Sequence, residues 1–260
     1  MNAHLKSSLI LTILTSALLS LCGCQLSTPE SRAQNVTAVA SRKSVTAQGD
    51  QVQPIKLLPV DESNLDPSFQ EFRNRLMIAV TNRDKGFVLS VLDPTIDNGY
   101  DIEPGVKEFK RRWKLDEPET TMWDVLTDIL ADGGTFNQTR TEFCAPYVVS
   151  QWDKVVRQLP EGTDSLGYLA IKGKDVAVRT DPHLTAPVVA TLSYDVVQYV
   201  SNSQVIDRSN PGASSWSKIK TPNGPEGFVL DIYLGSPMDY GVCFIKRKDK
   251  WVMTMLATHE

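Results

Sequence analysis

Val176-Ala177-Val178-Arg179 opens a series of short β-branched and aromatic runs, which continues through Ala190-Thr191-Leu192, Val196-Val197, Trp216-Ser217-Lys218-Ile219 and Gly227-Phe228-Val229. Pro, Gly, Asn and Asp stand between the runs. Each run is long enough for one strand, and each break carries residues that favour turns. The series therefore predicts a small all-β barrel of about five strands over residues 167–235.

The order of these residues resembles a bacterial SH3-type domain. The resemblance rests on Val176-x-Val178-Arg179, on Pro182, on Trp216-x-Lys218-Ile219 and on the closing Gly227-Phe228-Val229. It implies a module that binds peptidoglycan stem peptides or extended protein segments on exposed aromatic side chains. The candidate ligand-binding residues are Tyr199, Trp216, Phe228 and Tyr233. Trp216 and Phe228 also lie inside strand-like alternations, so a place in the barrel core is the competing expectation for both.

Residues 1–24 have the order of an export signal: Lys6, an apolar core over residues 9–19, and then small residues. The core is too short for a permanent membrane span. The end, Leu21-Cys22-Gly23-Cys24, resembles a bacterial lipobox, which implies that Cys24 carries a lipid and anchors the protein to the membrane. The alternative is an ordinary secretory signal with chance cysteines. Gln25 favours the outer membrane over retention at the inner one.

Residues 25–60 are rich in Ser, Thr, Ala and Gln and contain no aromatic residue. Such a segment buries too little apolar surface to offset the entropy of ordering, so it is expected to be a flexible tether. The whole chain has a formal net charge of -4, which argues against a nucleic-acid partner because phosphate binding needs a basic surface. The charge also gives no support for electrostatic attachment to anionic lipid.

Residues 61–160 are expected to form a mainly helical α+β domain. Asp66-Pro67 starts a helix that buries a stripe at helical spacing and leaves Arg73 to water. A short helix begins at Asp84 and stops at Asp93-Pro94. Two more helices are expected over residues 105–114 and 121–131, the last ending at Gly133-Gly134. The third helix carries a basic face, read as solvated rather than as a docking patch for an anionic polymer: Lys107, Lys110, Arg111, Arg112 and Lys114.

Residues 238–258 read as a hairpin of Val242-Cys243-Phe244-Ile245, a polar turn, and a strand from Trp251 to Leu256. A lone hairpin is marginal in water, so it is expected to pack on the first domain, with the barrel as an insertion. The turn from Ala79 to Asp84 and the terminal strand pair resemble the cone-shaped α+β fold of nuclear-transport-factor-like proteins. That resemblance implies a pocket for a small apolar molecule in the flanking domain.

No catalytic, metal or cofactor motif stands out in the sequence. Cys144 is a possible nucleophile, but only His183 and the penultimate His259 remain as bases after the signal, and neither has an orienting partner in sequence. Cys144 and Cys243 are the two thiols left once the signal cysteines are accounted for. In an oxidising compartment they are expected to form a disulfide, with two separate buried thiols as the alternative.

The sequence thus predicts a non-enzymatic, lipid-anchored protein of the cell envelope, exported to the periplasm or facing the outer membrane, with no cofactor. Its SH3-type module would bind peptidoglycan or an extended partner in the envelope. The alternative is a small-molecule-binding or lyase/isomerase-like protein that uses a pocket in the flanking α+β domain. A filled interior in that domain would argue against the alternative.

Overall fold

The structure is a computed structural model that describes residues 53–200, 203–208 and 214–258. The expected signal peptide, Cys24 and most of the tether lie outside the described residues. No helix in the described part of the chain is both long enough and apolar enough to cross a membrane.

The described chain contains both helices and strands, so the expected α+β class is confirmed. Helical elements are η1 (Ser63–Leu65), α1 (Pro67–Thr81), α2 (Lys85–Ser90), α3 (Val106–Arg112), α4 (Met122–Ala131), α5 (Tyr147–Ser150), α6 (Trp152–Val156), η2 (Ser165–Gly167) and η3 (Asp231–Tyr233). The strands before residue 200 are β1 (Leu92–Asp97), β2 (Thr135–Phe136), β3 (Glu142–Ala145), β4 (Tyr168–Ile171), β5 (Val176–Arg179), β6 (Val188–Leu192) and β7 (Val196–Tyr199). The later strands are β8 (Val205–Asp207), β9 (Ser214–Lys220), β10 (Glu226–Leu230), β11 (Leu234–Gly235), β12 (Tyr240–Arg247) and β13 (Lys250–Thr258).

Helix α1 begins where the sequence predicts. The Asp66 side chain accepts hydrogen bonds from the backbone amides of Ser68 and Phe69, and Pro67 opens the helix. These bonds lower the pKa of Asp66, since they favour its charged form, with the Ser68 hydroxyl contributing most. The expectation for Arg73 is wrong. Its guanidinium is largely buried, donates to the carbonyl of Leu130, and lies 3.4 Å from the Asp61 carboxylate.

The segment after α2 is a strand, which corrects the expected helix stop at Asp93-Pro94. Both residues lie in β1, at the edge of its sheet, where a missing amide on the outer side costs no ladder bond. Asp93 is buried and accepts from Thr95 and from Arg247, whose Nε lies 2.6 Å away. Burial alone would raise the pKa of Asp93, but these hydrogen bonds outweigh it and lower the pKa.

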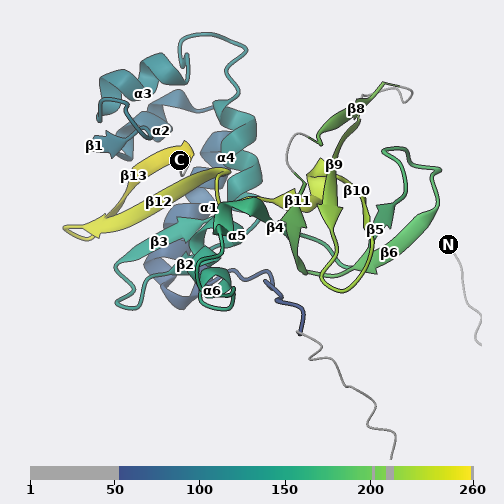
Figure 1. Cartoon of the computed structure of the whole chain (residues 1–260). Helices are drawn as coiled ribbons and strands as arrows, with labels where there is room; N and C mark the ends of the chain where they lie inside the picture. The colour runs from purple at the N-terminus through teal and green to yellow at the C-terminus, as the bar shows by residue number, and fades with distance from the viewer. Residues whose placement is uncertain (1–52, 201–202, 209–213, 259–260) are drawn as a thin grey trace, which may run out of the picture. The chain divides into compact units, whose positions relative to one another are not determined.

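Five strands form one sheet in the order β1-β13-β12-β3-β2. β12 and β13 are joined by a two-residue turn in which Lys248 and Asp249 both have positive φ, as a tight hairpin turn requires. The turn is shorter than the expected residues 246–250, because the strands extend up to it. β12 pairs antiparallel with β3, and β13 pairs parallel with β1. Figure 1 shows this C-terminal hairpin, in yellow, among the teal elements of the first region. Below, residues 61–160 and 238–258 together are called the α+β region.

The core of the α+β region combines aliphatic side chains with a group of buried aromatic rings. Phe69 of α1 lies with its ring centroid 4.3 Å from that of Phe143 and 4.8 Å from that of Trp251. Phe69, Phe143 and Phe244 have no exposed surface. The α4 helix adds Met122, Leu126 and further apolar side chains to the same cluster, including Trp123, Ile129 and Leu130. It ends before Gly133 as expected, where φ is +67° and a Cβ would meet the carbonyl of Val60 at 2.5 Å.

The apolar residues 143–149 are divided between a strand and a short helix. β3 ends at Ala145, a cis peptide leads into Pro146, and α5 begins at Tyr147. A short apolar run cannot by itself distinguish a buried strand from a buried helix turn.

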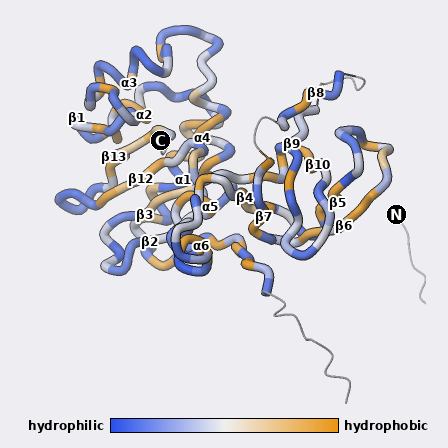
Figure 2. Tube along the Cα trace, viewed as in Figure 1, coloured by the Kyte–Doolittle hydropathy of each residue, from blue (hydrophilic) through white to orange (hydrophobic). Residues whose placement is uncertain are grey.

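A second sheet holds the strands of residues 167–235, called here the all-β region. The order is β11-β4-β7-β9-β10-β5-β6, and β8 pairs with β9. Among the described residues, β6 and β11 each pair with one strand only, so the sheet has two ends where a closed barrel of about five strands was expected. Its core cluster is aliphatic and contains Ile171, Val176, Val178, Leu192, Val197, Ile219 and Val229. Figure 2 shows hydrophobic segments in orange along the strands and blue turns between them.

The expected tether ends earlier than residue 60. Lys56 forms a β-bridge with Asp195, and the amide of Leu57 donates to the carbonyl of Tyr194. Leu57 is buried in a third cluster that joins helices α5 and α6 to β4 and β7, made with Tyr147, Val148, Trp152, Val155, Ala170 and Val196. Burial raises the pKa of Tyr147 to about 12. The apolar residues Ile55, Leu57 and Leu58, which end a polar stretch, are the sequence signal for this docking.

Candidate functional site

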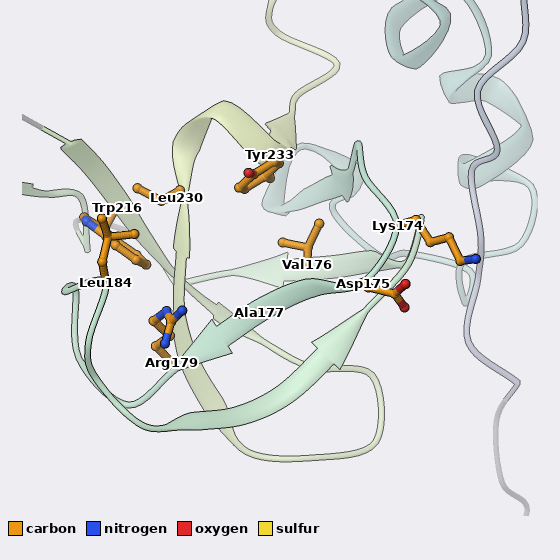
Figure 3. Close-up of a pocket in the computed structure, with 9 residues that line it drawn as sticks. All are labelled: Lys174, Asp175, Val176, Ala177, Arg179, Leu184, Trp216, Leu230 and Tyr233. Atoms are coloured by element: carbon orange, nitrogen blue, oxygen red, sulfur yellow. The ribbon is translucent and has the colours of Figure 1, made fainter. Parts of the chain in front are cut away.

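The outer face of the second sheet carries a pocket of about 250 Å³ built from β5, β9 and the end of β10. Figure 3 shows the residues that line it. Two of the four candidate aromatics, Trp216 and Tyr233, line it together. This outer pocket is the place where the predicted ligand-binding residues come closest to forming one site.

Trp216 faces away from the aliphatic core because side chains alternate along β9. Its neighbours Ser217 and Ile219 pair with the inward residues of β10, whereas Trp216 pairs with Leu230, which also lines the pocket. The indole is nevertheless 1% exposed. Trp216 is therefore buried, but it belongs neither to the aliphatic core cluster nor to an open surface.

Tyr233 and Leu184 form the accessible part of the outer pocket. Tyr233 comes from η3, directly after β10, and Leu184 comes from the loop between β5 and β6. Both keep more than two fifths of their surface exposed, at 43% and 44%. A ligand can thus reach an aromatic ring and an aliphatic side chain without any movement of the buried Trp216.

Charged side chains from one strand and its preceding turn complete the outer pocket. Arg179, at the end of β5, donates from one terminal nitrogen to the carbonyl of Ala186 at 2.7 Å. The guanidinium has five N–H donors, so most of them remain for a carboxylate. Lys174 and Asp175 stand at the other end of β5 and are exposed. The pocket therefore offers charges of both signs beside an apolar surface.

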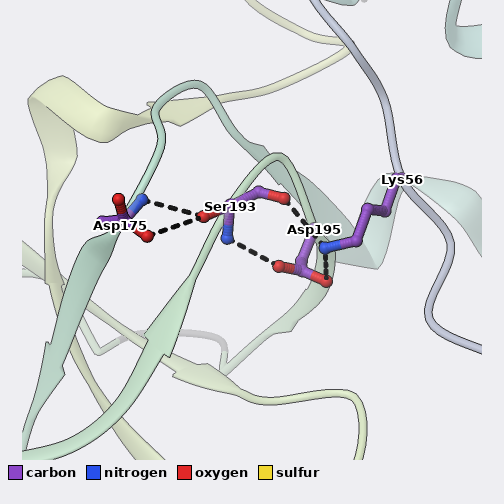
Figure 4. A network of polar contacts seen from close by, with 4 residues as sticks. All are labelled: Lys56, Asp175, Ser193 and Asp195. Carbon is purple, nitrogen blue, oxygen red and sulfur yellow. Dashed lines mark hydrogen bonds and ion pairs between the residues drawn. The ribbon is translucent and has the colours of Figure 1, made fainter. Parts of the chain in front are cut away.

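A hydrogen-bonded chain connects this pocket to the segment that follows the tether (Figure 4). The amide of Asp175 donates to the Ser193 hydroxyl at 2.8 Å, and the amide of Ser193 donates to Asp195 at 2.8 Å. Asp195 is buried, and it is paired with the Lys56 ammonium at 2.7 Å. The Lys56 ammonium also donates to the Ser193 carbonyl. Through this network Lys56, which lies outside the all-β region, stabilises the turns that carry Asp175 and Ser193.

The other two candidate aromatics do not join the outer pocket. Tyr199 lines a separate hollow with Ser217, Asp231 and Leu234. Phe228 is half-buried on β10, opposite Lys218 of β9 and Arg179 of β5. Sequence reasoning missed Arg179, Leu184 and Asp175. Arg179 ends the run Val176-Ala177-Val178-Arg179. Side chains alternate along a strand, so the inward valines at 176 and 178 could have placed Arg179 on the outer face.

Cys144 and Cys243 are joined by a disulfide with a Cα–Cα distance of 4.2 Å, across directly paired positions of β3 and β12. Together with Glu142 they are the one group in the described ranges whose potential metal-ligating atoms cluster. Since the disulfide uses both thiolates, the group offers a single carboxylate. His183 lies in the β5–β6 loop, where its Nδ1 contacts the Thr185 hydroxyl at 2.8 Å. His259 lies outside the described residues.

The basic face of α3 is exposed at Lys107, Lys110, Arg111 and Lys114, and Arg112 is partly buried. Arg111 pairs with Glu108, and the Lys114 ammonium lies 3.8 Å from the Glu117 carboxylate. Two of the basic side chains therefore have ion-pair partners within the helix or the turn after it. The Arg111 guanidinium lowers the pKa of Glu108.

No family model matches this chain, and comparisons with curated proteins and with solved structures found no match.

Proposed function

We propose that this protein is a non-enzymatic binding protein of the bacterial cell envelope, and that residues 167–235 form an SH3-type module. Its ligand is a peptidoglycan stem peptide or another extended peptide segment, bound at the outer pocket. The observation that carries the proposal is the outer pocket itself, where exposed Tyr233 and Leu184 stand beside Arg179 and Asp175.

The size and chemistry of the outer pocket favour an extended ligand. A volume of about 250 Å³ lies below the range of about 300–1,000 Å³ that is usual for small-molecule pockets, and it suits one or two side chains of a longer ligand. Aromatic surfaces of this kind serve extended peptides, which lose little entropy on binding. A stem peptide presents small alkyl side chains together with free carboxylates, which match the apolar surface and Arg179.

The cysteine chemistry supports binding rather than catalysis. Cys144 is the residue that the sequence raises as a nucleophile, and its sulfur is bonded to Cys243. A thiolate nucleophile needs a free sulfur and a base within hydrogen-bond reach.

The packing of the α+β region argues against the alternative of an enclosed small-molecule pocket. The space between α1, α4 and the sheet is filled by Phe69, Phe143 and Phe244, all without exposed surface. A cone-shaped binding cavity would need that space to be empty and lined by a few polar groups.

Attachment through a lipid on Cys24 is part of the proposal. Leu21, Gly23 and Cys24 have the spacing of a lipobox, and the folded region begins by about residue 54, roughly 30 residues later. Mass spectrometry of the membrane-bound protein should find the mature N-terminus at Cys24 with a diacylglyceryl group. A Cys24→Ser chain should appear as a soluble or uncleaved form, and an unmodified N-terminus downstream of residue 24 would remove the anchor from the proposal.

Co-sedimentation with purified peptidoglycan tests the ligand. The Cys24→Ser chain should sediment with peptidoglycan, and adding Tyr233→Ala should reduce the bound fraction severalfold, because an exposed aromatic wall is lost. Tyr100→Ala is the matched control, since Tyr100 is an exposed tyrosine of the α+β region at 78% exposure. Equal loss in both variants, or no loss in either, would rule out the outer pocket as the binding site.

A further inference from the structure

A groove on the outside of the α+β region lies between α1, α2 and the first residues of β13. It has a volume of about 530 Å³, within the usual range for binding sites. Phe72 and Phe87 supply aromatic surface, and Trp251 of β13 lines the opposite wall. This outer groove is distinct from the filled core, although it shares Trp251 with it.

One edge of β13 faces the outer groove without a partner strand. β1 begins at Leu92, which is opposite Met253, so the sheet ladder on that side stops before Trp251. The amide of Met253 donates to the carbonyl of Val91 at 2.7 Å, which fixes the side toward which Met253 points its backbone groups. Backbone groups alternate in direction along a strand, so the N–H and C=O of Trp251 point the same way.

The register of the hairpin independently predicts the direction of the Trp251 backbone groups. Lys250 is paired with Arg247 next to a two-residue turn, where the closing pair exchanges both hydrogen bonds. The next pair, Trp251 with Lys246, is then the non-hydrogen-bonded kind, which turns the backbone groups of Trp251 away from β12. Among the described residues no backbone partner stands against either group of Trp251.

Charges of both signs stand on each wall of the outer groove. Glu71 and Arg75 lie one turn apart on α1, and Asp249 and Lys250 lie at the hairpin turn. None of the four has an ion-pair partner within the described parts of the chain, although the Arg75 guanidinium lies 5.5 Å from the centroid of the Phe87 ring. An occupant that carries both an acidic and a basic group would complement them.

We propose that the outer groove is a second binding site, which takes an extended peptide segment as an added strand beside Trp251. The segment continues the line of β1 along β13, pairs its backbone with the N–H and C=O of Trp251, and lays alternate side chains on Phe72 and Phe87. Its acidic and basic side chains meet Arg75 or Lys250 and Glu71 or Asp249. This site is separate from the outer pocket, so it stands or fails independently of the proposed function.

The test uses capped seven-residue peptides of alternating Val and Thr with a charged residue at each end. Four peptides cover the end charges: Lys then Glu, Glu then Lys, Lys at both ends, and Glu at both ends. Each is also made with alternate backbone amides methylated, which removes hydrogen-bond donors and keeps the charges. Hydrogen exchange of the ¹⁵N-labelled Cys24→Ser chain is followed by NMR, with the Trp251 backbone amide as the reporter.

We expect a peptide with one acidic and one basic end to slow exchange of the Trp251 amide by about tenfold at ten times its dissociation constant. The methylated version should lose this protection. Arg75→Glu should weaken binding of the peptide with two acidic ends most, and it should strengthen binding of the peptide with two basic ends. Lys107→Glu is the matched control on α3, outside the outer groove. It should leave the ranking of the four peptide affinities unchanged.

Three results would overturn the proposal. The first is no change in Trp251 exchange with any of the four peptides at millimolar concentration. The second is equal protection by methylated and unmethylated peptides, because strand addition requires the donors. The third is protection of Trp251 that rises with protein concentration in the absence of peptide, which would make a second copy of this chain the occupant.

Discussion

The α+β region and the all-β region place their aromatic side chains in opposite ways. In the α+β region, Phe69, Phe143 and Phe244 point inward and leave no exposed surface. In the all-β region the core is aliphatic, and Trp216, Phe228 and Tyr233 stand outside it. Aromatic rings bury more area than aliphatic side chains, so the first arrangement favours stability. In the second arrangement Tyr233 stays 43% exposed, although Trp216 is buried.

The two sheets also differ in how the chain builds them. The all-β region uses strands from one continuous stretch, residues 167–235. The sheet of the α+β region joins β1, β2 and β3 to a hairpin that follows after the whole all-β region. The α+β region therefore depends on contacts between distant parts of the chain, and the disulfide spans a sequence separation of 99 residues.

The largest expected effect comes from removing the hairpin. A chain that ends at Ser236 lacks β12 and β13, the second and third strands in the order β1-β13-β12-β3-β2, and leaves β1 without a partner. We expect the NMR signals of residues 61–160 to collapse to unfolded positions while those of residues 167–235 stay dispersed. The loss of buried Phe244, Met253 and Leu256 alone removes a large part of a typical free energy of unfolding of about 5–15 kcal/mol. Stable folding of residues 60–165 in this chain would contradict the account.

Removing the disulfide should have the next largest effect. The chain-entropy model gives about 4.7 kcal/mol for a loop of this length, as an upper value. The double variant Cys144→Ala and Cys243→Ala should unfold the α+β region at lower denaturant concentration and leave the midpoint of the all-β region unchanged. Thiol titration of the denatured, unreduced wild type should find neither Cys144 nor Cys243 free. Two free thiols in that experiment would show that Cys144 and Cys243 do not form a disulfide.

A pair of core truncations compares the two regions directly. Phe69→Ala removes a ring that contacts five other aromatic rings, and it should cost about 3–5 kcal/mol in the α+β region. Ile219→Ala should cost about 2–5 kcal/mol in the all-β region, toward the lower end because less volume is removed. Denaturant melts followed by region-specific NMR signals measure both. A single shared transition that both variants shift equally would show that the regions unfold as one unit.

A smaller effect is expected where the two regions meet, at Tyr147. Burial raises its pKa to about 12 from its ordinary value of 10.0, so the folded state favours the neutral phenol. Its contribution is complete below pH 10 and is lost as the pH rises from 10 toward 12. Tyr147→Phe should therefore flatten the loss of stability over that range, and it also removes a buried hydroxyl without a hydrogen-bond partner among the described residues. Denaturant midpoints at pH 9 to 12 measure this, with Tyr100→Phe as the exposed control, and an unchanged slope for Tyr147→Phe would contradict the burial argument.

Local signals in the sequence predict local structure well in this chain. Asp66-Pro67 gives the start of α1, and Gly133 gives the end of α4, because capping depends on adjacent residues. The return of the hairpin to the first region was also predictable, since two lone strands cannot be stable by themselves. Arg73 could not be placed, because its buried partner is the carbonyl of Leu130, far away in sequence.

The remaining errors have the same physical origin. The sequence predicts a helix stop at Pro94, whereas the position of Pro94 at a sheet edge depends on β13, more than 150 residues later. The outer pocket could be predicted only in part, because Trp216 and Tyr233 come together through the pairing of β9 with β10, while Tyr199 turns into another hollow. A run of strands shows alternation but does not show which outward residues share one pocket.

The five tryptophans of the chain give a direct test of the division between the two regions, since each contributes one indole N–H signal in an NMR spectrum. Trp216 reports on the outer pocket and Trp251 on the core and outer groove of the α+β region. Soluble peptidoglycan fragments should be titrated into the ¹⁵N-labelled Cys24→Ser chain, with Trp216→Phe used to assign the signal. The account predicts that the Trp216 signal shifts and saturates while the Trp251 signal stays in place. A Trp216 signal that does not move up to the solubility limit of the fragments would contradict it.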